Sequence, residues 1–258
     1  MHSTGFTVMF AAAVCGVCSI FVAGSAVSLK ERQETNKVLD RQGKVLDVAG
    51  LVGEGEDLSA QDIASRYEEN IKPELIDLET GEPAEGDPAS FDQKKAAADP
   101  STSEAAPDNA AKVMRLPNKA LVFKIEQDGE LKGLIIPIEG KGLWSTLYGY
   151  LALQADARTI KGITFYQHGE TPGLGGEVDN PRWKSLWKGR MAYDESWDPK
   201  IAVKKGPAGP PEEDPYQVDG LSGATITSRG VTHLVQFWLG EHGYGPYLEK
   251  YRQEKGIQ

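Results

Sequence analysis

The chain has 258 residues, of which 40% are hydrophobic and 26% are charged, a composition that excludes a wholly disordered protein. With 28 Lys and Arg against 38 Asp and Glu the formal net charge is −10. This excludes a general nucleic-acid binder, because neutralising phosphates needs an excess of basic residues. Two cysteines are too few for a scaffold held together by disulfides.

The first predicted element is an uncharged segment over residues 6–29, which follows a short tail over residues 1–5. As a helix the segment would be about 36 Å long, enough to cross a hydrocarbon core of about 30 Å. A cleaved signal peptide is the alternative, but it would need a shorter apolar stretch and a basic segment, which the tail lacks. We therefore predict one uncleaved transmembrane helix, whose small residues suit packing against other membrane helices.

Two further features of this span bear on its role and orientation. Cys15 and Cys18 lie one turn apart on the same face, and we interpret them as small apolar residues of the span, with a redox or metal role as the alternative. Several Lys and Arg follow the span and none precedes it. Charge alone thus favours a cytoplasmic C-terminal domain, although long domains translocate regardless of flanking charge.

Residues 30–112 predict a juxtamembrane helix and an acidic, partly flexible region. The helix is indicated over residues 31–52, where charged residues alternate with Val and Leu. Residues 54–112 contain 16 acidic and 5 basic residues, a balance of −11, which leaves +1 for the rest of the chain. Within them residues 83–112, rich in Pro, Ala and Asp, predict a flexible, solvated surface excursion rather than a specific cation or partner site.

Residues 113–258 have the pattern of a folded α+β domain, with an antiparallel sheet and flanking helices. Asp128-Gly129 between two apolar runs predicts a hairpin, since Gly supplies the positive φ of a tight turn. Residues 148–154 and 159–167 predict a second hairpin.

The second half of this domain predicts mainly helices. A short helix is expected over residues 181–189, with Pro at its start, and a short strand over residues 201–203. Between about Thr227 and Leu239 apolar residues repeat at i, i+3, i+4, i+7 and i+8, which predicts an amphipathic helix.

Residues 219–228, with the sequence DGLSGATITS, lie at the start of this amphipathic helix. Small residues allow a tight backbone turn, and a helix start offers unpaired N–H donors and a positive dipole end, which suit a phosphate. A plain Ser/Thr helix cap is the alternative. Ser222 does not fit a hydrolase nucleophile of the Gly-x-Ser-x-Gly type, because Ala224 stands at the second glycine.

Residues 168–176, with the sequence HGETPGLGG, follow a predicted strand. Their Gly and Pro content predicts a shaped, exposed loop against which a flat ligand could lie, and an ordinary turn is the alternative. His168 with Glu170 could hold a metal, but we favour a hydrogen-bonding role for the histidine.

Together these stretches resemble the FMN-binding domains that carry flavin as a phosphoester on threonine. Residues 219–225 are similar to the motif Asp-x-x-Ser/Thr-Gly-Ala-Thr that the family's flavin transferase reads. Residues 170–175 are similar to the loop beside the isoalloxazine ring, and residues 142–144 with 148–150 also fit the family's pattern. With its single span, the whole chain resembles the NqrC family, the flavin-bearing subunits of that name in the Na⁺-translocating NADH:quinone oxidoreductases.

The resemblance implies an electron-carrying subunit with FMN bound covalently to Thr225, not catalytic alone, although spacing by itself leaves Thr227 and Ser228 open. It implies three flavin-binding segments: Leu143 and Trp144; Glu170, Thr171, Gly173, Leu174 and Gly175; and Asp219, Ser222, Gly223, Ala224, Thr225 and Thr227. No metal site is expected in the chain.

The resemblance also implies partners and a location. The partners are the other subunits of the Na⁺-translocating NADH:quinone oxidoreductase, the membrane and, during maturation, a flavin transferase; no nucleic acid is expected. The location is the bacterial inner membrane, with the FMN domain on the periplasmic side, against the flanking charge.

Two alternatives remain open on the sequence. The flavin subunit of an Rnf-type ferredoxin:NAD⁺ oxidoreductase would have the same fold and linkage in another complex. A membrane-tethered assembly or scaffold protein would have an FMN-like domain without flavin.

Overall fold

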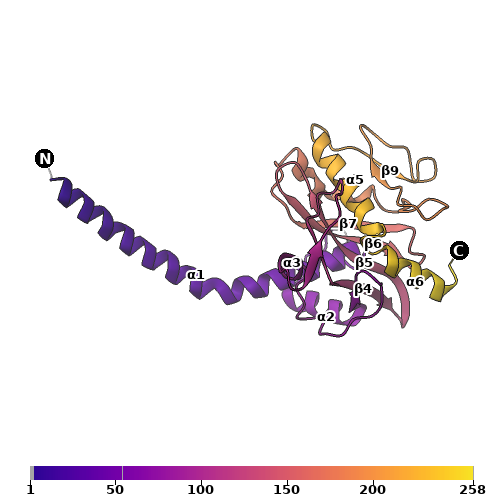
Figure 1. The fold of residues 1–258 in the computed structure, drawn as a ribbon, viewed down its shortest axis with the longest axis horizontal. Helices are drawn as coiled ribbons and strands as arrows, with labels where there is room; N and C mark the ends of the chain where they lie inside the picture. The colour runs from indigo at the N-terminus through magenta and orange to yellow at the C-terminus, as the bar shows by residue number, and fades with distance from the viewer. Residues whose placement is uncertain (1–2, 54, 258) are drawn as a thin grey trace. The chain divides into compact units, whose positions relative to one another are not determined.

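The computed structural model describes residues 3–53 and 55–257 and divides into two compact units, which meet between Arg41 and Gln42. Helix α1 (Thr4–Val48) supplies the whole of the first unit beyond Ser3 and the first residues of the second (Figure 1). Among the described residues α1 is the one helix long and apolar enough to cross a membrane. Residues 1–2 of the expected tail lie outside the described residues, and Thr4 already belongs to the helix.

The second unit is built on a five-stranded antiparallel sheet with the order β1-β4-β5-β6-β7. Its strands are β1 (Ile71–Asp77), β4 (Lys119–Gln127), β5 (Glu130–Lys141), β6 (Thr146–Gln154) and β7 (Ile160–Gln167). The predicted α+β fold and both predicted hairpins are confirmed. The turn between β4 and β5 has Asp128 at φ 53° and Gly129 at φ 76°, as a tight hairpin turn requires.

Strand β1 lies in a part of the chain that the sequence analysis placed before the domain. It pairs with β4 along its whole length, from Ile71 opposite Ile125 to Asp77 opposite Lys119. The expected boundary at residue 113 therefore falls inside this unit. The strand was not predicted because it stands at the edge of the sheet, where its Pro73 and charged residues are tolerated and obscure the apolar pattern.

Residues 83–112, expected to be a flexible excursion, instead form secondary structure and pack against the sheet. They contain helix α3 (Gln93–Ala98) and strand β2 (Ser103–Ala105), which pairs with β3 (Arg115–Pro117). The Gln93 amide accepts a hydrogen bond from the Leu121 backbone N–H (2.8 Å) and donates one to the Tyr244 hydroxyl (3.1 Å). These long-range contacts fix a segment whose composition alone indicated disorder.

The remaining elements surround the sheet. They are α2 (Ala60–Asn70), the 3₁₀ helix η1 (Gly175–Asp179), α4 (Pro181–Ser185), β8 (Ala202–Val203), β9 (Gln217–Val218), α5 (Thr225–Leu239) and α6 (Gly245–Lys255). Helix α4 is shorter than the predicted 181–189, and β8 confirms the short strand predicted over 201–203. Helix α5 confirms the amphipathic helix, and it begins two residues earlier than predicted.

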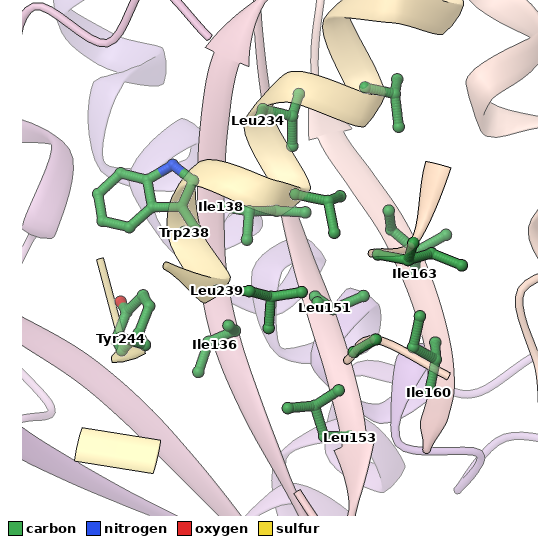
Figure 2. Packing of buried hydrophobic residues seen from close by; sticks show 14 of the residues in the cluster. Ile136, Ile138, Leu151, Leu153, Ile160, Ile163, Leu234, Trp238, Leu239 and Tyr244 are labelled. Atoms are coloured by element: carbon green, nitrogen blue, oxygen red, sulfur yellow. The ribbon is translucent and has the colours of Figure 1, made fainter. Parts of the chain in front are cut away.

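The sheet has an apolar core on each face, as expected when successive side chains of a strand point to opposite sides. On one face Leu134, Ile136 and Ile138 belong to the core that α5 covers, and Figure 2 shows Leu234, Trp238 and Leu239 of α5 beside these strands. Ile135, between them in sequence, belongs to the core of the other face. The last turns of α1 contribute Leu46 to that second core.

Candidate functional site

The three segments singled out in the sequence meet at one side chain, Glu170. Its carboxylate accepts hydrogen bonds from the Thr227 hydroxyl (2.6 Å) and from the backbone N–H groups of Trp144 (2.9 Å), Leu143 (3.2 Å) and Ser145 (3.2 Å). The amides belong to the loop between β5 and β6, Glu170 follows β7, and Thr227 lies in the first turn of α5. The structure therefore joins segments that are far apart in the chain.

Glu170 is 5% exposed, and its surroundings favour a charged carboxylate. Burial alone would raise its pKa, but the hydrogen bonds from the Thr227 hydroxyl and from the three amides outweigh burial, and the pKa is lowered from its ordinary value of 4.5. Donors that point at a carboxylate stabilise its ionised form. Glu170 is thus an anion held by neutral donors.

Two glycines make room for this carboxylate. A Cβ on Gly142 would lie 2.6 Å from Glu170 Oε1, and a Cβ on Gly175 would lie 2.6 Å from Thr227 Oγ1 and 2.7 Å from Glu170 Oε2. Both distances are too short for a carbon atom, so any side chain at either position would push the segments apart. Gly175, expected to contact a cofactor, lies against Glu170 and Thr227 instead.

The start of α5 exposes one threonine and buries the next. Thr225 is exposed, whereas Thr227 is fully buried with its hydroxyl on Glu170. Ser228 is also buried, and its hydroxyl accepts a hydrogen bond from the Leu221 N–H (3.1 Å). The N-cap residue is Ala224, with no side-chain cap, so the alternative of a plain Ser/Thr cap is wrong.

Large apolar side chains are exposed on all three segments. We call this set the apolar rim; it comprises Leu143, Trp144, Leu174 and Ile226, with Trp144 67% exposed. A Cβ on Gly223, whose φ is 70°, would lie 2.9 Å from Leu174 Cδ2, so the turn before α5 and the loop after β7 are in contact. Exposed apolar residues that gather at one place indicate a binding surface.

Ile226 is the member of the rim that the sequence analysis missed. Its signal was present in the sequence, since it is an apolar residue off the i, i+3, i+4 face of the predicted helix. Of the other expected residues, Ser222, Thr171 and Gly173 are exposed on the same segments.

Asp219 does not join the cluster around Glu170. Its side chain accepts a hydrogen bond from the Ala208 N–H (2.8 Å), and its backbone carbonyl accepts one from the Trp183 indole (2.8 Å). A Cβ on Gly220 would lie 2.3 Å from the Lys204 carbonyl oxygen. Asp219 and Gly220 therefore anchor the turn before α5 to a neighbouring loop.

His168 has a hydrogen-bonding role. One ring nitrogen lies 2.7 Å from Asp179 Oδ2, and the other accepts the Glu170 N–H at 3.2 Å. Because the Glu170 carboxylate points at Thr227 and the amides, it does not share a ligand with His168. Within the described part of the chain there is no group of three or more His, Cys, Asp or Glu that could hold a metal ion.

Comparison with known proteins places these segments in a family context. Residues 142–240, which contain all three segments, match the family model described as the FMN-binding domain. The NqrC protein of the Na(+)-translocating NADH-quinone reductase of Pseudomonas aeruginosa is 45% identical over 98% of this chain and 97% of its own length. The NqrC protein of Yersinia pestis is 42% identical over 97% of this chain and 94% of its own length.

Solved structures give the same picture. The crystal structure of Shewanella oneidensis NqrC superposes with a TM-score of 0.78 and 37% identity, covering 84% of this chain and 99% of that one. The crystal structure of the corresponding protein from Parabacteroides distasonis superposes with a TM-score of 0.67 and 32% identity, covering 85% of this chain and 96% of that one.

Proposed function

The chain belongs to the NqrC family of the Na(+)-translocating NADH-quinone reductases, and from this membership we propose that it is the electron-carrying subunit of such a complex, with one FMN bound covalently to Thr225. Of the two complexes considered from the sequence, membership of this family favours the Na⁺-translocating reductase over the Rnf-type enzyme. The subunit relays electrons, and oxidation of NADH belongs to another subunit.

The observation that carries the attachment site is the difference between the hydroxyls at the start of α5. Thr225 is exposed, whereas the hydroxyls of Thr227 and Ser228 are buried in hydrogen bonds. A nucleophile must reach the reacting phosphorus, so an exposed hydroxyl is required. Spacing alone left all three open, and burial favours Thr225.

The surroundings of Thr225 suit both ends of FMN. The phosphate would lie at the N-terminus of α5, where the helix dipole is positive and no side chain caps the first turn, an arrangement that stabilises anions. The apolar rim would hold the isoalloxazine ring, because flat aromatic ligands bind to apolar side chains. Glu170 lies beneath these segments and would position them.

The attachment is a phosphoryl transfer to the threonine. The Thr225 oxygen forms a bond to the flavin-side phosphorus of a flavin dinucleotide, the hydroxyl proton is released and the pyrophosphate bond breaks, with metal assistance from the transferase. When bound, FMN supplies one-electron chemistry, while the protein supplies position and polarity. A covalent bond keeps the flavin at an exposed site from which it could otherwise dissociate.

We propose that α1 anchors the subunit in the bacterial inner membrane, with the flavin domain on the periplasmic side. Its length and hydropathy support a span, and the periplasmic side follows from the family resemblance. The basic residues after the span oppose this orientation, but a domain of this length is expected to translocate regardless of them.

A substitution at the attachment residue tests the proposal. Thr225→Val removes the hydroxyl while keeping nearly the same shape, and we expect it to abolish flavin fluorescence of the denatured protein in a gel. Ser228→Ala is the control and should keep the fluorescence. Fluorescence retained in Thr225→Val would contradict attachment at this residue and move it to Thr227 or Ser228.

The absorption spectrum of the purified protein separates this function from that of a scaffold without flavin. Protein made together with the transferase should be yellow, and protein made without it should be folded and colourless. A colourless protein in both preparations would favour the scaffold, and a tightly bound flavin without transferase would indicate noncovalent binding.

A further inference from the structure

We propose that Glu170 is a positioning residue rather than a flavin ligand, and that its buried charge assembles the flavin-binding segments before any flavin is attached. The contacts between Glu170 and the donors on Leu143, Trp144, Ser145 and Thr227 are called the Glu170 clamp. The identity of the ligand rests on the proposed function, but the clamp itself is a property of the polypeptide.

The clamp joins parts of the chain that no regular strand pairing connects. The loop that carries Trp144 lies 26 residues before Glu170, and Thr227 lies 57 residues after it. The Gly169 N–H adds a hydrogen bond to the Ser145 hydroxyl (2.6 Å) beside the clamp. The relative placement of Trp144, Leu174 and Thr225, on which a flavin site depends, is therefore set by this one carboxylate.

The clamp requires a carboxylate rather than any polar side chain. All four groups that point at Glu170 are donors, and an ionised carboxylate is a pure acceptor with room for four hydrogen bonds. Glutamine has the same shape, but its NH₂ group would face donors and leave some of them unpaired. A buried unpaired donor is costly, so Glu170→Gln should loosen the segments without leaving a void.

The clamp also assigns a role to the second threonine of the motif. Thr227 donates its only hydroxyl proton to Glu170, and through it the first turn of α5 is tied to the loop after β7. Because Thr225 belongs to the same turn, its position relative to the apolar rim is held by Thr227. The two threonines therefore have different tasks, attachment for Thr225 and positioning for Thr227.

Hydrogen exchange in the full-length chain without flavin tests the clamp directly. We expect Glu170→Gln to speed amide exchange by about tenfold or more at residues 143–145 and in the first turn of α5, with β4 and β5 unchanged. Glu195→Gln, the same change at an exposed position, is the control and should exchange like the parent. Unchanged exchange at both places in folded Glu170→Gln protein would overturn the proposal.

The pair Thr227→Val and Thr227→Ser keeps the proposal testable if Glu170→Gln does not fold. We expect Thr227→Val to speed exchange at residues 143–145, although it touches none of them, and Thr227→Ser to restore the parent rate because it keeps the hydroxyl. If valine and serine behave alike, the clamp is refuted.

Flavin-loaded protein gives a readout that a merely structural role would not move. Replacing a buried anion near the flavin segments by a neutral group should raise the flavin reduction potential of Glu170→Gln, since reduction adds negative charge. An unchanged potential in loaded, folded protein would contradict the placement of the flavin against the segments that Glu170 joins. Absence of covalent flavin in the parent protein would refute the proposed function and leave the exchange experiment still interpretable.

Discussion

At the scale of single residues, burial decides what chemically identical groups can do. Thr225 and Thr227 are two residues apart in the same helical turn, yet one is exposed and the other donates its hydroxyl to a buried carboxylate. The sequence could indicate that a hydroxyl of this motif is modified, but the choice between them depends on Glu170, which lies 57 residues before Thr227 in the chain. Attachment and positioning are therefore separated by tertiary contacts.

The charge of Glu170 gives stability a defined pH dependence. Because the pKa of Glu170 is lowered in the folded state from 4.5, its stabilisation is fully present above that value and is lost as the pH falls through the lowered pKa. We expect Thr227→Val to cost about 1–3 kcal/mol of unfolding free energy near neutral pH and less in acid, measured by denaturant unfolding of flavin-free protein.

A double-mutant comparison isolates this dependence from other carboxylates. The pKa values of Asp87, Asp99 and Asp194 are also lowered, by hydrogen bonds to neighbouring groups, so the parent protein alone would show their combined titration. In a Glu170→Gln background the cost of Thr227→Val should be independent of pH. The same acid dependence in both backgrounds would mean that Glu170 is not the titrating partner.

At the scale of elements, the site depends on how closely α5 approaches the sheet. A Cβ on Gly140 of β5 would lie 2.5 Å from the Leu234 Cβ of α5, and a Cβ on Gly230 of α5 would lie 2.4 Å from the Lys141 carbonyl oxygen. These two glycines let the helix lie directly on the strand. Its N-terminus, with Thr225, is thereby placed beside the loop that follows β5.

We expect Gly140→Ala to destabilise the protein by about 1–3 kcal/mol, because the added methyl group overpacks the contact between α5 and β5. Gly43→Ala in α1 is a matched control, since its Cβ would meet only Ile63 Cδ1 at 3.8 Å, and in a helix interior it should stabilise by about 0.5–1 kcal/mol. Chemical unfolding in detergent measures both. Equal effects of the two substitutions would contradict the close packing.

The elements that could be predicted from the sequence are those determined by neighbouring residues. The Asp128-Gly129 turn and the apolar face of α5 carry their own signals, and both are found as predicted. Strand β1 and helix α3 do not, because they are held by the pairing of β1 with β4 and by the contacts of Gln93 with Leu121 and Tyr244.

The same distinction holds for the site. The motif before α5 and the Gly/Pro-rich loop after β7 were recognisable in the sequence, and so was the presence of Glu170 and Thr227 among the site residues. That Glu170 accepts hydrogen bonds from Thr227 and from the loop of Trp144 could not be predicted, since it requires the register of three separate segments.

At the scale of the whole molecule, one helix belongs to both units of the chain. The apolar part of α1 lies in the first unit, while its last turns complete the second core of the flavin domain, with Leu46 fully buried. Asp47 in the same turn pairs with Lys184 of α4 at 2.8 Å. The proposed membrane anchor is thus continuous with an integral part of the domain.

We expect Leu46→Ala to lower the unfolding free energy of the domain by about 2–5 kcal/mol, because it removes a fully buried side chain. Val38→Ala in the same helix is the control, since Val38 is 55% exposed, and its effect should stay within about 0.5 kcal/mol. Thermal unfolding of the full-length chain in detergent tests the pair, and an equally mild effect of both would mean that the end of α1 is not part of the core.

Mass spectrometry of the native protein tests the covalent flavin most directly. The peptide that contains Thr225 should carry the mass of FMN less one water, with fragment ions that place it on this threonine, and the intact chain should show the same single increment. An unmodified peptide from native material, or an increment on Thr227 or Ser228, would contradict attachment of the flavin to Thr225.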